Sequence, residues 1–318
     1  MNVLVTGGAG FIGSNLTRSL VASGHRVRIL DDLSTGHASN LEGLEDRIDF
    51  VLGDIRDPEV VRRAMSQVEV VFHLAALPSV ERSVRDPVRS NSVNVDGTLT
   101  VLLAACDAGA RRLVYASSSS VYGDAPTLPK VEDMAVSTRS PYAASKLAGE
   151  AYCRAFTRTH GLDTVSLRFF NVFGPRQDPD SQYAAVIPRF LTSMLAGEPP
   201  VIFGDGSQSR DFTFVDNAVE ACLRASGAGD QAAGEVMNVA CGERITLLQL
   251  VAGLNDVLSL NLAPVFAEPR VGDVQHSLAS IERARALIGY APLVPVSRGL
   301  EVTAGWFTAR GAPARAAS

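Results

Sequence analysis

The sequence predicts an α/β fold built around a doubly wound parallel sheet, and two observations indicate it. From Val3 onward, short β-branched runs alternate with segments of helical periodicity, and a glycine-rich turn joins the first strand to the first helix. Near-continuous apolar strands separated by helices are typical of a parallel sheet covered on both faces. Such a sheet binds its ligand outside the carboxyl ends of its strands, so the functional site is expected there.

The expected elements follow this alternation in order. Six strands are predicted, over residues 3–6, 26–30, 48–52, 68–73, 112–116 and 163–167. Helices are predicted between them, near residues 12–23, 58–66, 91–109 and 141–160.

Beyond about Asn171 the alternation weakens, and prolines and glycines interrupt short segments, which predicts a second, smaller lobe. Residues 236–239 are apolar enough to form a strand that returns to the main sheet. We therefore expect a nucleotide-binding Rossmann domain formed by residues 1–170 plus about 207–240. The substrate-binding lobe is expected over about 171–206 plus 241–318, with small residues fraying at the end.

Composition excludes several classes of protein. The 318 residues are 46% hydrophobic, which suffices for a large core, and the net charge of −5 with scattered Lys and Arg predicts neither nucleic acid nor an anionic membrane as partner. Four cysteines lie far apart without a Cys-x-x-Cys pair, so neither a disulfide framework nor a metal site is expected. No signal peptide and no apolar stretch of about 20 residues is found, which predicts a soluble, cytoplasmic protein.

The glycine-rich turn is the first candidate site. Gly7, Gly10 and Gly13 have a Gly-x-x-Gly-x-x-Gly spacing that also includes Phe11 and Ile12. Gly7 permits a tight turn, Gly10 lets the backbone approach a pyrophosphate, and Gly13 lets helix and strand pack closely. The amino end of the following helix attracts the anion. The alternative, an ordinary glycine turn, is weakened by the residues that end the next strands.

Those strand ends carry short polar or small side chains. Asp31 lies eighteen residues after Gly13, where an acidic group accepts hydrogen bonds from a ribose. No Arg follows it to receive a 2′-phosphate, so NAD is expected rather than NADP. The other residues expected to contact the cofactor are Asp32, Ser34, Thr35, Gly36, Asp54, Ile55, Leu74, Ala75 and Ala76.

Tyr142 and Lys146 are the candidate catalytic pair. They lie four residues apart at the start of a predicted helix that Ser140 caps, so both side chains can point into one cleft. Ser118 belongs to a serine run directly after the fifth strand, at the edge where the nucleotide is expected. A surface pair and a solvated loop are the plainer interpretations of these two features. Because Ser118 and the Tyr142 and Lys146 pair are expected at the same edge of the sheet as the nucleotide, a catalytic role is favoured.

The chemistry indicated is oxidation of an alcohol. A tyrosine with a pKa near 10 is a poor base at neutral pH, but the ammonium of Lys146 and the positive nicotinamide ring are both expected to lower its pKa. Tyr142 then takes the hydroxyl proton while the carbon gives hydride to NAD, and Ser118 holds and relays that proton.

With the glycine turn, Ser118 and Tyr142-x-x-x-Lys146, the chain resembles the extended short-chain dehydrogenases/reductases, and among them the UDP-sugar 4-epimerases. The resemblance runs from Val3 to about Phe307. It implies that tightly bound NAD oxidises C4 of the sugar and that a 4-keto intermediate swings about its diphosphate link. Hydride then returns to the opposite face, so no NAD is consumed.

The resemblance also implies residue roles. Tyr142 is the base, Lys146 has the lysine role, Ser118 relays the proton, and Phe170 lies by the nicotinamide. For the substrate, Asn171, Arg210 and Arg270 contact the diphosphate, the backbone at Ala185 and Val186 contacts uracil, Phe203 stacks on it, Asp273 holds the ribose, and Ser79, Ser117, Ser119 and Ser277 lie around the sugar. Core packing of Phe203 and surface ion pairs of the two arginines are the alternatives.

The same resemblance narrows the activity. Related 4,6-dehydratases have an Asp-Glu pair where this chain has Ser119 and Ser120, and related decarboxylases have a Glu there, so elimination is disfavoured. Ser277 replaces a bulky Tyr, which leaves room for an N-acetyl group and indicates UDP-GlcNAc and UDP-GalNAc, with UDP-glucose and UDP-galactose as secondary substrates. Pro78 departs from the expected turn and leaves a UDP-glucuronate 4-epimerase open.

Two further alternatives concern whether the protein is catalytically active and whether it forms a dimer. A non-catalytic NAD-sensing protein would need only the nucleotide site, so retention of Tyr142, Lys146 and Ser118 argues against it. The helices over residues 91–109 and 141–160 carry more apolar residues than one core face requires, and the resemblance implies that they pair in a homodimer. The alternative is that both helix faces are covered within one chain.

Overall fold

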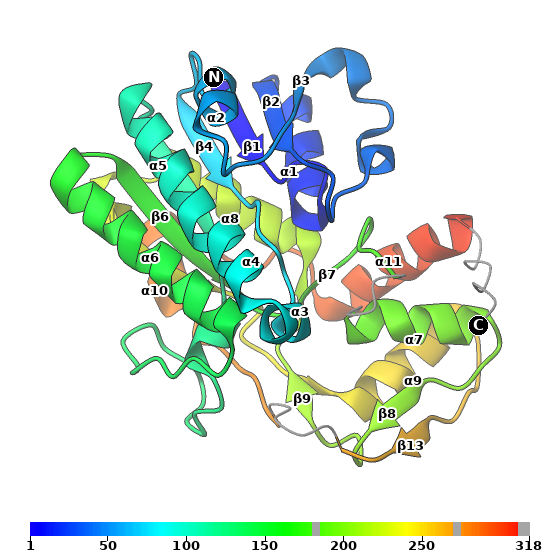
Figure 1. Cartoon of the computed structure of the whole chain (residues 1–318). Helices are drawn as coiled ribbons and strands as arrows, with labels where there is room; N and C mark the ends of the chain where they lie inside the picture. The colour runs from blue at the N-terminus through cyan, green and yellow to red at the C-terminus, as the bar shows by residue number, and fades with distance from the viewer. Residues whose placement is uncertain (180–184, 270–274, 311–318) are drawn as a thin grey trace.

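A seven-stranded parallel sheet forms the larger part of the chain (Figure 1), which confirms the predicted fold class. The computed structural model describes residues 1–179, 185–269 and 275–310. The strands of the sheet have the order β11-β6-β5-β4-β1-β2-β3, so the direction in which successive strands are added changes between β1 and β4. The strands are β1 (Asn2–Thr6), β2 (Arg26–Asp31), β3 (Ile48–Leu52), β4 (Val70–His73), β5 (Arg112–Ser118), β6 (Asp163–Phe169) and β11 (Glu235–Val239).

Helices cover both faces of this sheet because apolar residues alternate along its strands. Val3 and Val5 belong to the core cluster under one face, and Leu4 belongs to the cluster under the other. The first face packs against α1 (Phe11–Ala22), α8 (Val215–Gly227) and α10 (Glu282–Ile288). The second packs against α2 (Pro58–Ala64), α5 (Gly97–Asp107) and α6 (Pro141–His160).

The stretch predicted as a helix, residues 91–109, is helical as far as Asp107, but it is not uniformly α-helical. That stretch contains the end of α4 (Pro87–Asn91), a π-helical segment over Ser92–Asp96, and α5. Asn94 lies in the π-helical turn, and its buried amide bonds to the backbone of Leu77 and to Ser145 instead of facing solvent. The wider turn accommodates this inward side chain, as π-helical turns often do at functional sites.

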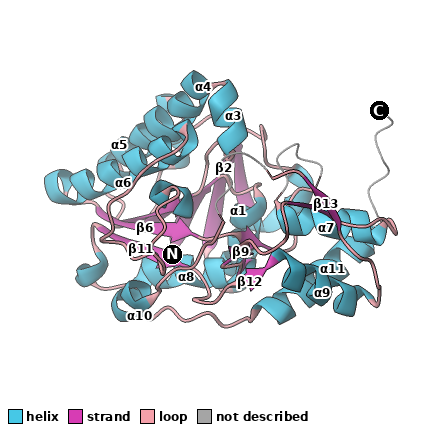
Figure 2. Cartoon of the chain, turned by 90° about the horizontal axis from the view of Figure 1, so that it is seen from below, coloured by secondary structure: helices cyan, strands magenta, loops and turns pink. Residues whose placement is uncertain are grey.

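The smaller lobe packs around a third core cluster that includes Phe173, Phe190 and Leu250. Figure 2 shows α7, α9 and α11 gathered beside the main sheet. The lobe contains α7 (Val186–Leu195), α9 (Leu247–Leu258) and α11 (Val296–Arg310), with the strand pairs β7 (Val172–Phe173) and β10 (Thr213–Phe214), β9 (Ser209–Arg210) and β12 (Ile245–Thr246), and β8 (Val201–Phe203) and β13 (Val265–Ala267).

The two parts are interleaved along the chain, as the strand at residues 236–239 predicts. β11 pairs with β6 at the edge of the main sheet. Two details differ from the predicted division. Within the smaller lobe β9 pairs with β12 and β10 pairs with β7, and Ala279, Ile288 and Tyr290 belong to the core of the main sheet. The remaining elements are α3 (Val80–Arg85) and the 3-10 turns Ala38–Leu41, Glu45–Arg47, Ser119–Tyr122 and Asp230–Ala232.

Two global features bear on the protein's surroundings. Within the described residues, no helix combines the length and the apolar character that crossing a membrane requires. The four cysteines are free thiols.

Asn217 provides a test of how the C-terminal segment is held. Its buried side chain accepts hydrogen bonds from the backbone N–H groups of Leu293 (2.8 Å) and Val294 (3.0 Å) and donates to the Val294 carbonyl (2.8 Å). We expect Asn217→Ala to lower the free energy of unfolding by about 3 kcal/mol, because three part-buried backbone groups lose their partners. Denaturant titration measures this. Asn261→Ala, at an exposed position, should change it by no more than about 0.5 kcal/mol, and equal losses would contradict the assignment.

Candidate active site

The glycine turn after β1 leaves no room for side chains. Gly7 has a φ of 71°, and a Cβ there would lie 2.7 Å from the Ala75 nitrogen at the end of β4. A Cβ at Gly13 would lie 2.0 Å from the Gly7 carbonyl oxygen. Gly10 precedes α1, which no side chain of the described residues caps. This bare helix terminus, approached through glycine backbone, fits a dinucleotide pyrophosphate.

Asp31 joins the end of β2 to this turn. Its buried carboxylate accepts hydrogen bonds from the backbone N–H groups of Ala9 and Leu33, each at 2.9 Å. Burial raises the pKa of Asp31, and the two backbone donors oppose that rise. Each carboxylate oxygen keeps acceptor capacity, so a ribose hydroxyl can still bind there. Gly36 lies against Ala9, and the hydroxyl of Ser34 donates to Asp32 at 2.6 Å.

The ends of β3 and β4 complete this edge. Arg56 holds the carboxylate of Asp54 through its Nε (2.9 Å), and this hydrogen bond lowers the pKa of Asp54. His73 has a role that the sequence did not reveal. Its ring bonds to Thr6 Oγ1 (2.7 Å) and Thr98 Oγ1 (2.9 Å), and burial lowers its pKa to about 3. A neutral His73 therefore fixes β4 beside the glycine turn. Ile55 is buried nearby, whereas Leu74, Ala75 and Ala76 are half-buried.

Helix α6 carries the candidate catalytic pair, and its boundaries are those predicted. Ser140 caps it by accepting from Ala143 N–H (3.1 Å), and Pro141 begins it. Lys146 is buried, and its Nζ donates to the Ala116 carbonyl of β5 at 2.9 Å. The same Nζ lies 6.0 Å from the ring centre of Tyr142. Tyr142 also bonds to Ser118, so the three predicted catalytic residues meet at the end of β5.

The pKa of Tyr142 corrects one expectation. Burial raises it above the ordinary value, and only the hydrogen bond with Ser118 opposes the rise. The predicted lowering by Lys146 is therefore not achieved by the protein's own groups. Burial also lowers the pKa of Lys146 to about 8, so the ammonium persists at neutral pH and is lost as pH rises through about 8.

The side chains of the serine run lie on different faces of the sheet, because successive side chains alternate along a strand. Ser117 shares its face of β5 with Tyr115 and is buried, and its hydroxyl donates to Glu150 of α6. Its predicted place beside a sugar is therefore corrected. Ser118 ends the strand and accepts from Ser120 N–H (3.2 Å), and Ser119 begins the following turn, half-buried.

Three residues that sequence reasoning missed hold the backbone of Tyr142. Its N–H donates to Ser83 Oγ at 3.0 Å, and its carbonyl accepts from Ser145 Oγ at 2.8 Å. Ser145 in turn accepts from the amide of Asn94 at 3.0 Å. The one sequence signal for this hydrogen-bonded group is an Asn in the middle of a predicted helix, where Asn is unfavourable.

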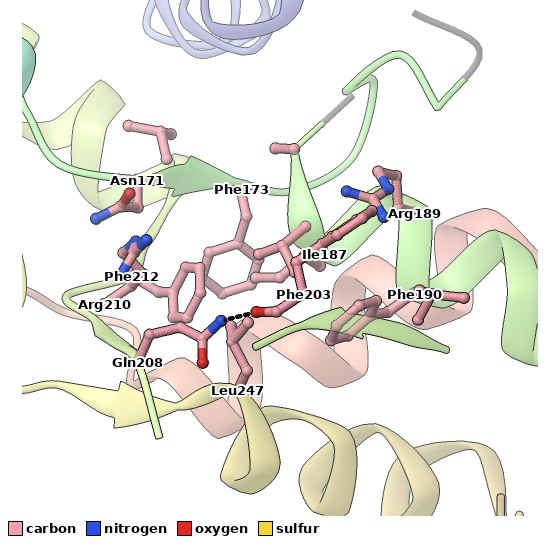
Figure 3. A pocket seen from close by; sticks show the side chains of 14 residues that line it. Asn171, Phe173, Ile187, Arg189, Phe190, Phe203, Gln208, Arg210, Phe212 and Leu247 are labelled. Atoms are coloured by element: carbon pink, nitrogen blue, oxygen red, sulfur yellow. Dashed lines mark hydrogen bonds between the residues drawn. The ribbon is translucent and has the colours of Figure 1, made fainter. Parts of the chain in front are cut away.

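A cavity of about 260 Å³ lies in the smaller lobe (Figure 3). It brings together predicted substrate residues from separate segments, namely Asn171, Ala185, Val186, Phe203 and Arg210. Sequence reasoning missed the rest of its lining, which includes Phe173, Ile187, Arg189, Gln208, Phe212 and Leu247.

The chemistry of this cavity is aromatic and cationic. The guanidinium of Arg189 lies 5.4 Å from the ring centre of Phe203, and Gln208 donates to the Phe203 carbonyl. The side chain of Arg210 donates to the Gln275 carbonyl at 3.1 Å. Phe203 is half-buried and lines the cavity, which favours a binding role over core packing. The cavity therefore suits a flat ring joined to an anion.

The remaining predicted residues lie around these two sites. Phe170 is buried beside Tyr122, with ring centres 6.0 Å apart, and Asn171 follows it with its amide on the Asp211 carbonyl (2.9 Å). Ser277 N–H donates to Ser209 at 3.0 Å, beside Arg210. Ser79 caps α3. Arg270 and Asp273 lie outside the described residues.

Comparisons with known proteins agree with this geometry. The family described as the NAD dependent epimerase/dehydratase family matches residues 3–240. A UDP-glucose 4-epimerase from Mycolicibacterium smegmatis is 43% identical over 311 residues, which are 96% of this chain and 98% of that protein.

Two solved structures are similar over nearly their whole length. One is a UDP-N-acetylglucosamine 4-epimerase from Methanobrevibacter ruminantium in complex with UDP-N-acetylmuramic acid, with a TM-score of 0.93 and 39% identity over 97% of this chain and 98% of that one. The other is a UDP-glucose 4-epimerase from Thermotoga maritima with UDP-glucose, with a TM-score of 0.92 and 37% identity over 98% and 99%.

The glycine turn can be tested by adding one methyl group. We expect Gly13→Ala to weaken NAD binding about tenfold or more, because the new Cβ displaces the Gly7 carbonyl and with it the phosphate-binding backbone. Calorimetric titration of the apoprotein with NAD measures the affinity. Gly305→Ala is the control, since nothing lies within 4 Å of its Cβ. Equal NAD affinity of Gly13→Ala and the parent would contradict the assigned site.

Proposed function

Since this chain belongs to the NAD-dependent epimerase/dehydratase family, we infer that it is an NAD-dependent UDP-sugar 4-epimerase, and we propose UDP-GlcNAc and UDP-GalNAc as its preferred pair. UDP-glucose and UDP-galactose are proposed as secondary substrates. The observation that carries this proposal is the meeting of Tyr142, Lys146 and Ser118 at the end of β5, at the same edge of the parallel sheet as the glycine turn. A cavity lined by aromatic and cationic side chains lies in the smaller lobe.

NAD fits the edge formed by the glycine turn, Asp31 and the end of β4. We assign its pyrophosphate to Gly10 and the amino end of α1, and its adenosine ribose to Asp31. When bound, NAD supplies reversible hydride transfer and a positively charged ring near Tyr142. Lys146 is buried and Tyr142 is half-buried, so the chain shields both side chains from much of the solvent.

In the proposed mechanism the proton moves through the side chains of α6 and β5. Tyr142 Oη takes the proton of the C4 hydroxyl as the C4 hydrogen leaves as hydride, and returns it when the ketone is reduced. Ser118 holds the sugar oxygen and the phenol in one hydrogen-bonded chain. Lys146 favours the phenolate only as its ammonium, so the rate should fall as pH rises through about 8.

Epimerisation also requires the sugar to turn while the nucleotide stays bound. We propose that uracil occupies the cavity against Phe203 and the backbone at Ala185 and Val186, and that Arg210 binds the diphosphate, with Arg270 predicted beside it. Asp273 is assigned to the ribose from the resemblance alone. Because the anchoring groups belong to the smaller lobe and the reacting groups to the main sheet, the keto sugar can rotate between them.

The choice of sugar rests on Ser277, whose small side chain lies beside the strand of Arg210. A UDP-glucuronate 4-epimerase is the second candidate, which Pro78 in the loop before α3 leaves open. Cytoplasmic location, with four free thiols, stays a prediction.

A homodimer through α5 and α6 also stays a proposal. Leu103 and Ala151 are exposed on these helices, whereas the apolar side chains of Leu102 and Phe156 are buried within the chain. The surface available for pairing is therefore narrower than the pattern alone predicts.

The function is tested by incubating the purified protein with each of the four UDP-sugars and no added cofactor, and identifying the products. Tyr142→Phe should lower kcat roughly 10²–10⁴-fold, because it removes the group that carries the proton. Tyr152→Phe is the matched control, since it makes the same change on an exposed residue of the same helix. Conversion by Tyr142→Phe at the parental rate would refute the mechanism, and conversion of UDP-glucuronate alone would select the second candidate.

Ser277→Tyr tests the sugar pocket. We expect kcat/KM for UDP-GlcNAc to fall about ten- to a hundredfold, because a bulky side chain costs about 1–3 kcal/mol where an N-acetyl group must fit. The value for UDP-glucose should change little. Ser277→Ala controls for loss of the hydroxyl alone. Equal losses for both sugars would remove Ser277 from the specificity argument.

A further inference from the structure

Glu150 is a buried carboxylate one helical turn beyond Lys146, with 5% of its side chain exposed. Arg168 of β6 donates to both of its oxygens, from Nε at 2.9 Å and from Nη2 at 2.8 Å. The hydroxyl of Ser117 donates to the same carboxylate. Ser117 and Arg168 are paired residues of neighbouring strands, so Glu150 bridges β5 and β6 directly beneath Ser118.

We propose that Glu150 is a positioning residue of the epimerase, which fixes the end of β5 against α6 and supplies the negative charge that Lys146 faces. This deepens the proposed function and rests on it. Two residues of one helix face hold two consecutive residues of one strand: Lys146 binds the Ala116 carbonyl, and Glu150 binds the Ser117 hydroxyl. The next residue, Ser118, is thereby held at a fixed distance from Tyr142.

The same ion pair supports the turn on the far side of Ser118. The guanidinium of Arg168 lies 4.7 Å from the ring centre of Tyr122, which ends the turn that Ser119 begins. The Tyr122 hydroxyl donates to Asn238 of β11 at 2.7 Å. Ser118 is thus held from both directions by one connected set of buried side chains. A displacement of about 1 Å at such a residue is enough to lower a rate about a hundredfold.

Charge gives Glu150 its second effect. The titratable groups around Lys146 are Tyr142, Glu150 and Cys153 of α6, Tyr115 of β5 and His73 of β4. Burial raises the pKa of the Cys153 thiol to about 12 and of both phenols above their ordinary values, and His73 is neutral. Cys153 and Glu150 both oppose the loss of the Lys146 proton, and because the Cys153 thiol stays neutral, Glu150 supplies the carboxylate among these described groups. Without that charge, the alkaline limit of activity should move to lower pH.

A purely structural ion pair is the competing explanation, and the chain contains a matched control for it. Arg112 and Asp163 form another pair across β5 and β6, at the opposite end of both strands, with Nη2 and Oδ2 3.0 Å apart. Arg112 is buried like Arg168. Asp163→Asn therefore weakens the same strand pairing far from the chemistry.

The experiment measures kcat, KM and the pH profile of UDP-sugar conversion, together with NAD content and Tm, for the parent and four variants. Glu150→Gln/Arg168→Gln removes both charges, and so leaves no unpaired buried cation. It should lower kcat about a hundredfold with KM nearly unchanged. Glu150→Gln alone removes the negative charge that Lys146 faces, and it should shift the alkaline limit to lower pH. Ser117→Ala should lower kcat about tenfold without moving that limit, because it breaks the link to β5 and keeps the charge. Asp163→Asn should lower only Tm.

The outcomes separate the two proposals. A parent that converts none of the UDP-sugars overturns the proposed function itself. An active parent whose Glu150→Gln/Arg168→Gln and Ser117→Ala variants keep the parental kcat and pH profile overturns only the role of Glu150. A loss that merely follows Tm, as in Asp163→Asn, does the same. If the double variant does not fold, Ser117→Ala decides the positioning role.

Discussion

The close approach of α6 to β5 is the constraint on which the catalytic geometry depends. A Cβ at Gly149 would lie 2.1 Å from the hydroxyl of Tyr115, so only glycine lets the helix lie so near the strand. At this separation the side chain of Lys146 reaches a strand carbonyl and that of Glu150 reaches a strand hydroxyl. Tyr142, one turn before Lys146, is thereby placed over the end of the same strand. The chemistry is therefore organised by helix packing as much as by the reacting residues.

In the proposed reaction the edge of the main sheet holds the reacting groups, and the smaller lobe binds the nucleotide of the substrate. The edge of the parallel sheet is rigid, because His73, Asp31 and the glycine turn are joined by short hydrogen bonds to neighbouring strands. The cavity in the smaller lobe is formed by side chains from several short elements around Phe203. A rigid reacting edge and a separate nucleotide anchor suit a reaction in which one part of the substrate turns while the other stays in place.

The sequence predicted those site residues that are recognisable from a short segment of the chain. The glycine spacing, Asp31 at a strand end and the Tyr142 and Lys146 pair all follow from residue type and position along one or two elements. The UDP-binding residues came from the resemblance, and the structure gathers those it describes into one cavity or its neighbourhood. The nucleotide roles of these residues stay predictions.

What the sequence could not show depends on partners far along the chain. The inward side chain of Asn94, which lies in a π-helical turn of the predicted helix, is explained by Leu77 and Ser145. Ser117 was misplaced because its partner, Glu150, lies on another element. The pKa of Tyr142 depends on how fully the folded chain removes water from the phenol, which spacing does not reveal.

The interleaving of the two lobes has a consequence for synthesis. β11 joins the sheet beside β6, and α10 covers that edge with residues as late as Ile288. While the chain emerges from the ribosome, the nucleotide-binding half therefore stays incomplete until nearly all of the polypeptide has been made. Neither lobe is encoded by one continuous segment of the chain, so neither can be expressed alone as a simple truncation.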